Sequence, residues 1–364
     1  MKITIVAGAR PNFMKIAPLI RAMDQLQTPK KPIIYRLIHT GQHYDSNLSD
    51  TFFEELQIPL PHNNLNIKSG SQAVQTAGIM MAFEKELIEH RPDFVLVVGD
   101  VTSTMACAIT TKKATLKLIH VEAGIRSGDR SMPEEINRMV TDSITDYFFT
   151  TSEKATQNLI NSGHSKENIF FVGNVMIDTL LQNLDRLRKP VFWDDLQLER
   201  KKYYLLTLHR PSNVDAQSKF VDLFSEISKM AQNIPIVFPV HPRTQQIILR
   251  SKMKLPNIHF VEPQGYLPFI YLLKHSKAVL TDSGGITEEA SVLDVPCLTF
   301  RDTTERPETC DLGTNMLVSN DKTKIAEAFE KLSNSRWKKA QDIPLWDGKA
   351  SQRIVQELLR IYYG

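Results

Sequence analysis

Two series of short apolar segments, each alternating with amphipathic stretches, constrain the fold of this 364-residue chain more than any other feature. In the first series the apolar segments are residues 2–8, 33–40, 94–99, 117–121, 147–150 and 168–172. Amphipathic stretches lie between them, for example at residues 16–27, 72–89 and 102–113. Strands and helices that alternate in this way predict a doubly wound parallel sheet.

The alternation starts again after a polar helix with a charged tail that ends near residue 190. Strands are expected at residues 203–208, 234–240, 258–261, 278–281 and 297–300, and helices at residues 219–232, 244–249, 266–274 and 284–293. We therefore expect an α/β protein of two Rossmann-like domains, residues 1–173 and 174–350, which face each other across a cleft. We expect the last helix, residues 351–364, to pack back on the first domain.

The composition excludes several classes of protein. A formal net charge of +3 without a long basic run gives no indication of nucleic acid as a partner. Three cysteines without a C-x-x-C spacing suit a reducing compartment and argue against a disulfide framework or structural zinc. No apolar run approaches the roughly 18 residues of a membrane span. We therefore expect a cytoplasmic protein. The sequence also lacks H-E-x-x-H, nucleophile-elbow and P-loop motifs, so metal hydrolysis, acyl transfer and kinase chemistry have no support.

A Ser-Gly-Gly turn in the second domain, Ser283 to Gly285, follows a predicted strand and precedes a predicted helix. The first N–H groups of a helix have no partner within it, and glycine lets an anion come close to them. Glu289, farther along the helix, would reach the hydroxyls of a ribose whose phosphates bind at the turn. The alternative is an ordinary turn followed by a solvated pair of glutamates.

Two histidines, His209 and His241, follow successive predicted strands of the second domain, and each precedes an arginine within two residues. Together they would line one rim of the cleft. His209 would exchange a proton near neutral pH or hold a diphosphate, although a structural hydrogen-bonding role is the alternative. Arg210 follows His209 directly, and Arg306 adds a guanidinium after the last strand, so the domain suits a nucleoside diphosphate.

Charged residues also follow the strands of the first domain. Arg10 and Lys15 lie where the first turn enters its helix, and both suit a phosphate, although a charged surface loop is the alternative. Asp100 ends a strand apolar enough to be buried, so it would be either a helix N-cap or a catalytic carboxylate. Glu122 follows a strand that is otherwise core, where a buried carboxylate is costly without a role or a partner.

The segment Pro133-Glu134-Glu135 predicts a helix start, with proline in the first turn and acids at the positive end. The two glutamates would complement the helix dipole or form salt bridges with Arg126 and Arg138. With the two other carboxylates of this domain, Glu134 would alternatively perform acid–base chemistry on the group that the diphosphate carries.

In this order the motifs resemble the UDP-N-acetylglucosamine 2-epimerase family, which has the GT-B arrangement of two Rossmann-like domains. The motifs are Gly8–Lys15, Gly41–His43, Gly99–Thr102, His120–Arg126, Pro133–Arg138, Val172–Asn174, His209–Arg210, Val240–Pro242, Asp282–Glu289 and Arg301–Glu308. The resemblance implies a non-hydrolysing isomerase that needs no metal or redox cofactor. It would interconvert UDP-N-acetylglucosamine and UDP-N-acetylmannosamine for surface polysaccharide, and it would be a homodimer.

The resemblance also implies roles for particular residues. The catalytic residues would be Asp100, Glu122, Glu134, His209 and Lys15. The UDP-sugar would be bound by Arg10, Arg138, Arg210, His241, Ser283, Gly284, Gly285, Glu289 and Arg306. Loss of the C2 proton with departure of UDP would give 2-acetamidoglucal, and UDP would add again after reprotonation on the other face. The carboxylate that removes the proton is left open.

Some positions depart from the family and keep alternatives open. Gln42, His43 and Gln72 match a second UDP-sugar site that activates many bacterial members, but Ser71 stands where those members have arginine. The segment Gly8–Pro11 carries Ala9, as in relatives that act on 2,3-diacetamido uronic acid derivatives. The alternatives are an epimerase of such a sugar, a hydrolysing 2-epimerase and, in other classes, a GT-B glycosyltransferase or a nucleotide-sugar sensor.

Overall fold

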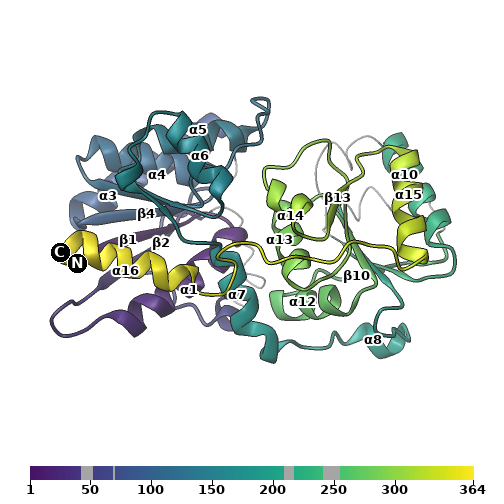
Figure 1. Cartoon of the computed structure of the whole chain (residues 1–364). Helices are drawn as coiled ribbons and strands as arrows, with labels where there is room; N and C mark the ends of the chain where they lie inside the picture. The colour runs from purple at the N-terminus through teal and green to yellow at the C-terminus, as the bar shows by residue number, and fades with distance from the viewer. Residues whose placement is uncertain (42–51, 69, 209–216, 241–254) are drawn as a thin grey trace. The chain divides into compact units, whose positions relative to one another are not determined.

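A computed structural model describes residues 1–41, 52–68, 70–208, 217–240 and 255–364, with residues 10 and 217–221 described by their backbone alone (Figure 1). The chain forms two compact units. The first contains Met1–Gln182 and Pro344–Gly364, and the second contains Asn183–Ile343. Each unit is built on one parallel sheet, which confirms the prediction of two Rossmann-like α/β domains.

The sheet of the first unit has the strand order β3-β2-β1-β4-β5-β6-β7, and all its pairs are parallel. Its strands are β1 (Lys2–Ala7), β2 (Ile34–His39), β3 (Asn63–Asn64), β4 (Phe94–Val98), β5 (Lys117–Val121), β6 (Tyr147–Thr150) and β7 (Ile169–Phe171). Every residue of the apolar strand β4 is buried, as in a parallel strand covered on both faces. The strand order reverses between β1 and β4, and ligands of such sheets bind at that switch point.

The helices of the first unit are α1 (Arg10–Leu26), α3 (Gln72–Glu89), α4 (Thr102–Lys113), α5 (Pro133–Ile144), α6 (Glu153–Asn161), α7 (Val175–Asn183) and α16 (Ala350–Tyr363). The C-terminal helix α16 returns to this unit and packs against α1 (Figure 1). Its start is fixed because the Asp178 carboxylate accepts hydrogen bonds from the N–H groups of Ala350 (3.0 Å) and Ser351 (2.6 Å). At its end Tyr363 accepts a hydrogen bond from the Met1 ammonium at 2.8 Å, so the two termini lie side by side.

The sheet of the second unit has the order β10-β9-β8-β11-β12-β13, again all parallel. Its strands are β8 (Tyr204–Thr207), β9 (Ile236–Pro239), β10 (Ile258–Val261), β11 (Ala278–Thr281), β12 (Cys297–Thr299) and β13 (Asn315–Leu317). Its helices are α8 (Phe192–Asp195), α10 (Gln217–Ala231), α12 (Tyr266–His275), α13 (Gly284–Val292), α14 (Pro307–Asp311) and α15 (Lys322–Ser333). The switch point lies between β8 and β11, which are neighbours in the sheet although they are the first and fourth strands of this unit along the chain.

Two short edge strands, β3 of two residues and β13 of three, were not expected from the sequence. The helix expected at residues 244–249 lies outside the described residues. Within the described ranges, no helix is long and apolar enough to cross a membrane.

Candidate active site

The switch point of the first unit brings Lys15 and Glu122 together. Lys15 lies on α1, Glu122 directly follows β5, and the Lys15 ammonium forms an ion pair with the Glu122 carboxylate. The two side chains are only 9 % and 2 % exposed. Glu122 also has a φ of 69°, in the left-handed region that non-glycine residues rarely adopt. Backbone strain and a buried ion pair at one residue are typical of a functional position.

Gly99, which follows β4, makes room for this pair. It has a φ of 67°, and a Cβ added there would lie 2.8 Å from Lys15 Nζ and 3.2 Å from Glu122 Oε2. Asn12 ties the neighbouring loops together: its Oδ1 accepts two backbone N–H groups after β1, both at 3.0 Å, and its Nδ2 donates to the Val98 carbonyl at 3.2 Å. Because the Gly99 N–H also donates to the Val121 carbonyl at 3.0 Å, the ends of β1, β4 and β5 form one hydrogen-bonded unit.

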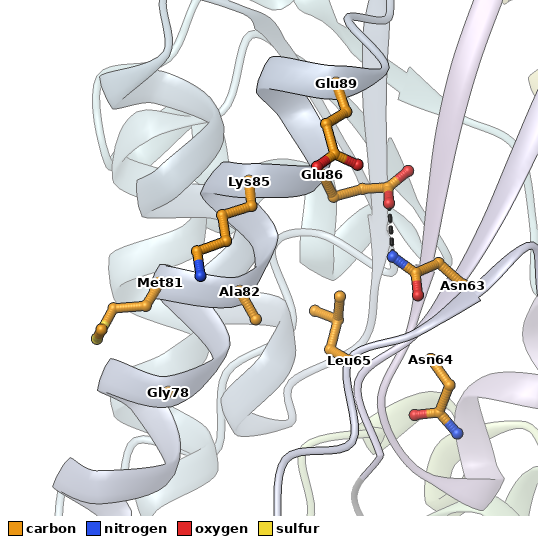
Figure 2. Close-up of a pocket in the computed structure, with 9 residues that line it drawn as sticks. All are labelled: Asn63, Asn64, Leu65, Gly78, Met81, Ala82, Lys85, Glu86 and Glu89. Atoms are coloured by element: carbon orange, nitrogen blue, oxygen red, sulfur yellow. Dashed lines mark hydrogen bonds between the residues drawn. The ribbon is translucent and has the colours of Figure 1, made fainter.

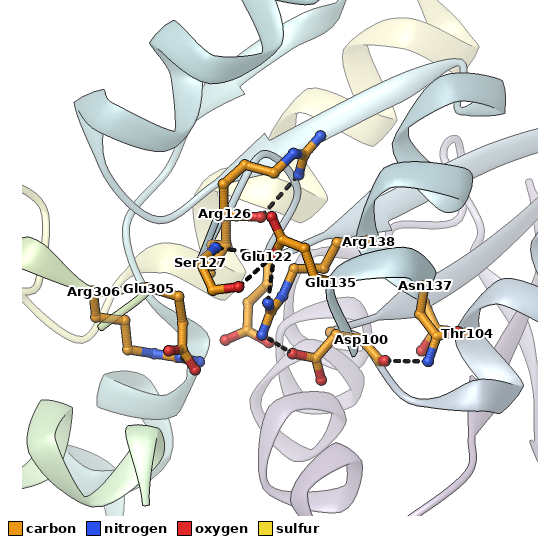
Figure 3. Close-up of polar contacts among 12 residues, drawn as sticks. Asp100, Thr104, Glu122, Arg126, Ser127, Glu135, Asn137, Arg138, Glu305 and Arg306 are labelled. Atoms are coloured by element: carbon orange, nitrogen blue, oxygen red, sulfur yellow. Dashed lines mark hydrogen bonds and ion pairs between the residues drawn. The ribbon is translucent and has the colours of Figure 1, made fainter. Parts of the chain in front are cut away.

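Asp100 is held from α5. Its carboxylate pairs with the Arg138 guanidinium, and its carbonyl accepts from Asn137 Nδ2 at 2.8 Å (Figure 3). The N-cap of α4 is Val101, so Asp100 does not have the capping role that the sequence left open. The Asp100 side chain is 25 % exposed, which leaves its carboxylate accessible to a ligand.

The glutamate that joins this network is Glu135 (Figure 3). It accepts hydrogen bonds from the Ser127 N–H (2.9 Å), the Gly128 N–H (3.1 Å) and Arg138 Nη1 (2.9 Å). Burial opposes ionisation of Glu135, but the hydrogen bonds from Ser127, Arg138 and Gly128 outweigh it and hold its pKa below the ordinary value. Glu134, the residue singled out from the sequence, is exposed in the first turn of α5.

A second network of hydrogen bonds connects the Gly99 carbonyl to His120 and Asp142. His120 was not among the predicted site residues. His120 Nδ1 lies 2.7 Å from Asp142 Oδ1, and its Nε2 lies 2.9 Å from the Gly99 carbonyl. Asp142 also accepts a hydrogen bond from Arg126 Nη1 at 2.6 Å. Arg126 thus pairs with Asp142. From the sequence, its partners were expected among the glutamates at the start of α5.

In the second unit the Ser283–Gly285 turn follows β11 at the switch point and begins α13. Ser283 is the N-cap, but its side chain makes no capping hydrogen bond. Arg306 lies beside the turn, since a Cβ added to Gly284 would be 2.9 Å from Arg306 Nη1. The Arg306 guanidinium is bound by the Glu288 carboxylate and by Glu305 Oε1, the latter at 3.0 Å.

Glu289 is buried on α13, where its Oε1 accepts a hydrogen bond from the Tyr266 hydroxyl at 3.1 Å. Burial raises the pKa of Glu289 to about 8; the Tyr266 hydrogen bond opposes this rise and the charge of Glu288 adds to it. A carboxyl group beside a tyrosine hydroxyl can exchange hydrogen bonds with a sugar hydroxyl.

His209, Arg210, His241, Gln42 and His43 lie outside the described residues, as does the side chain of Arg10. Among the residues that are described, no three His, Cys, Asp or Glu side chains come together as a metal site requires.

Gln72 is the first residue of α3, and its Oε1 accepts a hydrogen bond from Thr102 Oγ1 at 2.9 Å. Farther along α3, a cavity of about 380 Å³ is lined by Lys85, Glu86 and Glu89, with Asn63 donating to Glu86 across it at 2.7 Å (Figure 2). No predicted site residue in the described part of the chain lines this cavity.

Fold and site define a protein of two Rossmann-like domains, one with paired carboxylates and cations at its switch point and one with a glycine turn at a helix N-terminus. The family model described as UDP-N-acetylglucosamine 2-epimerase matches residues 27–359. The chain belongs to this family, which confirms the resemblance drawn from the motifs.

Individual relatives agree over the whole chain. The UDP-N-acetylglucosamine 2-epimerase of Methanocaldococcus jannaschii is 42% identical over 98% of this chain and 99% of its own length. The UDP-2,3-diacetamido-2,3-dideoxy-D-glucuronate 2-epimerase of Pseudomonas aeruginosa is 37% identical over 99% of this chain and 100% of its own. The crystal structure of the M. jannaschii enzyme in complex with UDP-GlcNAc and UDP matches with a TM-score of 0.89 at 41% identity, covering 100% of both chains.

Proposed function

We propose that this chain is a non-hydrolysing UDP-N-acetylglucosamine 2-epimerase that interconverts UDP-GlcNAc and UDP-ManNAc. Its family membership and its full-length similarity to the M. jannaschii enzyme support this function. The observation that carries the proposal is the arrangement at the first switch point, where Asp100 and Glu122 come from neighbouring loops and each is paired with a cation.

The reaction begins with an elimination. A carboxylate takes the C2 proton, the C2–H electron pair forms the C1=C2 double bond, and the C1–O bond breaks with its electrons leaving on UDP. The 2-acetamidoglucal that results then receives a proton at C2 on the opposite face, and UDP adds again at C1. Because the C2 proton is weakly acidic, the leaving diphosphate needs electrostatic stabilisation, for which we propose Lys15, His209 and Arg210.

Inversion at C2 requires proton transfer on two faces of the sugar, and two carboxylates on different loops suit this requirement. Asp100 follows β4 and Glu122 follows β5, so one can act as the base while the other returns the proton. Each of the two carboxylates is held by a cation, Asp100 by Arg138 and Glu122 by Lys15. Glu134 remains a predicted third member of the catalytic set.

We assign UDP binding to the second unit. The N–H groups at the start of α13, preceded by Ser283 and including Gly284 and Gly285, suit the diphosphate, with Arg306 beside them. Glu289 suits the ribose hydroxyls. Arg10, Arg138, Arg210 and His241 complete the proposed set of binding residues.

The function is tested by proton NMR of the purified chain with UDP-GlcNAc in D2O without an acceptor. Accumulation of UDP-ManNAc with deuterium at C2 is expected. Free ManNAc plus UDP would identify a hydrolysing enzyme, and turnover only after addition of an acceptor would identify a glycosyltransferase. Tight binding of UDP-GlcNAc with no exchange at C2 would indicate a sensor.

A second substrate is favoured by Ala9 in the first turn and by the 37% identity to the P. aeruginosa relative. If UDP-GlcNAc exchanges no proton, the same assay with the UDP-2,3-diacetamido uronic acid distinguishes this alternative. Exchange with that sugar alone would move the chain to that branch of the family.

A homodimer, a cytoplasmic location and a supply of sugar for surface polysaccharide complete the proposal. Activation by a second UDP-sugar through Gln42, His43 and Gln72 is a further part of it. Light scattering tests the dimer, and a sigmoidal dependence of rate on UDP-GlcNAc concentration tests the activation.

A further inference from the structure

His120 of β5 is fully buried and has a hydrogen-bond partner at each ring nitrogen. Its Nε2 lies 2.9 Å from the Gly99 carbonyl oxygen. A carbonyl oxygen only accepts hydrogen bonds, so Nε2 must carry a hydrogen and donate it.

The other nitrogen, Nδ1, lies 2.7 Å from Oδ1 of Asp142. Oδ2 of Asp142 accepts the Gly124 N–H at 3.1 Å and the Arg126 guanidinium at 2.6 Å. Burial opposes ionisation of Asp142, but its pKa lies below the ordinary value, and Arg126 beside it is a permanent positive charge. An ionised carboxylate only accepts hydrogen bonds, so Nδ1 opposite it must carry a hydrogen as well.

Gly99 is held by two hydrogen bonds to β5. The Gly99 N–H donates to the Val121 carbonyl at 3.0 Å, and the Gly99 carbonyl accepts from His120 Nε2. Both polar backbone groups of Gly99 are thus fixed by β5, at a φ of 67°, where an added Cβ would meet Lys15 Nζ and Glu122 Oε2. A hydrogen bond from a charged donor is stronger than one from a neutral donor.

We propose that His120 acts as an imidazolium positioning residue that fixes the Gly99 backbone and thereby sets the carboxylates of Asp100 and Glu122 relative to each other. Its Nε2 donates a hydrogen bond to the Gly99 carbonyl, and Asp142 of α5 holds its Nδ1. This inference rests on the proposed function, in which Asp100 and Glu122 transfer the C2 proton.

The first test measures protonation directly and needs no substrate. In the full-length protein labelled with ¹⁵N-histidine, both His120 nitrogens should have the chemical shifts of protonated imidazolium nitrogens at neutral pH. The resonance is assigned by its loss in His120→Gln. An unprotonated nitrogen in the wild type would overturn the proposal.

The second test measures turnover of the UDP-sugar that the wild type converts. Glutamine can still donate to the Gly99 carbonyl but carries no charge, so His120→Gln should lower kcat by about tenfold or more, which corresponds to about 1.4 kcal/mol. KM and the Kd for UDP should stay within about twofold, because UDP binding is assigned to the second unit. His164→Gln is the matched control, since His164 packs on the Phe148 ring in the same unit and should leave kcat unchanged.

A His120→Gln protein with unchanged kcat, or with an equal loss of UDP affinity, would overturn the positioning role. Asp142→Asn keeps an acceptor for Nδ1 but removes the charge that stabilises the imidazolium, so it should also lower kcat without changing the Kd for UDP. It serves as the deciding variant if His120→Gln does not fold. A wild type that converts no UDP-sugar would refute the proposed function, and the NMR measurement would then decide the protonation state by itself.

Discussion

The two units have the same strand order around their switch points but place different chemistry there. In the first unit, a carboxylate follows each of β4 and β5, and each has a cationic partner: Arg138 for Asp100 and Lys15 for Glu122. In the second unit the switch point carries the Ser283–Gly285 turn, and the nearby cation, Arg306, is bound by two glutamates.

In the proposed function, this difference separates proton transfer at the first switch point from anion binding at the second. Each carboxylate of the first switch point is held in place by the cation beside it. Two glutamates that hold an arginine fix the guanidinium beside the turn, and the helix N–H groups there are available to a phosphate. Changes at the first switch point should therefore alter kcat, and changes at the second should alter UDP affinity.

The largest effect is expected from removing the charge of a carboxylate in the first unit. Asp100→Asn or Glu122→Gln should lower turnover by on the order of 10²- to 10⁴-fold, because acid–base catalysis supplies about that factor. Deuterium exchange at C2 measures turnover, and calorimetry should find the Kd for UDP within a few-fold of the wild-type value. Glu153→Gln, an exposed change on α6, is the control. Near wild-type rates in either variant would refute the acid–base assignment.

The second largest effect is expected at Glu289 and should concern affinity. Glu289→Ala removes the proposed ribose partner and leaves the buried Tyr266 hydroxyl without its acceptor, so the Kd for UDP should rise by about 10- to 100-fold. Glu289→Gln keeps an acceptor of the same size and should cost less. Calorimetry with UDP is the measurement, and an unchanged Kd in Glu289→Ala would disprove the ribose role.

A matched pair of glycine substitutions compares the two switch points directly. Gly99→Ala introduces strain at a φ of 67° and displaces Lys15, so kcat should fall by roughly tenfold or more. Gly284→Ala brings a methyl group to 2.9 Å from the Arg306 guanidinium, so the Kd for UDP should rise by up to about tenfold while kcat at saturation is kept. If both variants changed the same kinetic parameter, the proposed division of labour would be wrong.

The sequence predicted the fold because alternating apolar and amphipathic segments specify strands and helices locally. It also singled out Lys15, Asp100 and Glu122, because polar residues at the carboxyl ends of parallel strands converge on one edge. The structure adds that Lys15 and Glu122 form a buried pair, which requires the left-handed backbone of Glu122 and the absence of a side chain at Gly99.

Other parts of the site depend on details that local patterns do not contain. Of the two adjacent glutamates, Glu135 and not Glu134 joins the network, because the first turn of α5 directs Glu135 toward Ser127. The three-residue spacing of Glu135 and Arg138 was the available signal. The partner of His120 is Asp142, on a different element, and nothing in the sequence connects these two residues before the tertiary structure forms.

The last comparison concerns the pH dependence of stability, for which the two units should have opposite signs. Folding lowers the pKa of Glu135, so its contribution is present above the unfolded pKa and is lost as the pH falls through the folded value. Folding raises the pKa of Glu289 from 4.5 to about 8, so between these values the folded state binds more protons than the unfolded state. The contribution of Glu289 to stability therefore falls as the pH rises through this window, and above about 8 it no longer changes.

Between pH 6 and 8 the loss from Glu289 should be on the order of 2 kcal/mol, since one unit of differential protonation is worth about 1.4 kcal/mol. Urea unfolding of the full chain at both pH values, compared with Glu289→Gln, measures this difference, and the variant should be the less pH-sensitive protein. Equal pH dependence in the two proteins would mean that Glu289 is already ionised at pH 6. UDP would then meet a charged ribose partner, and the second switch point would resemble the first more closely than the hydrogen bond from Tyr266 suggests.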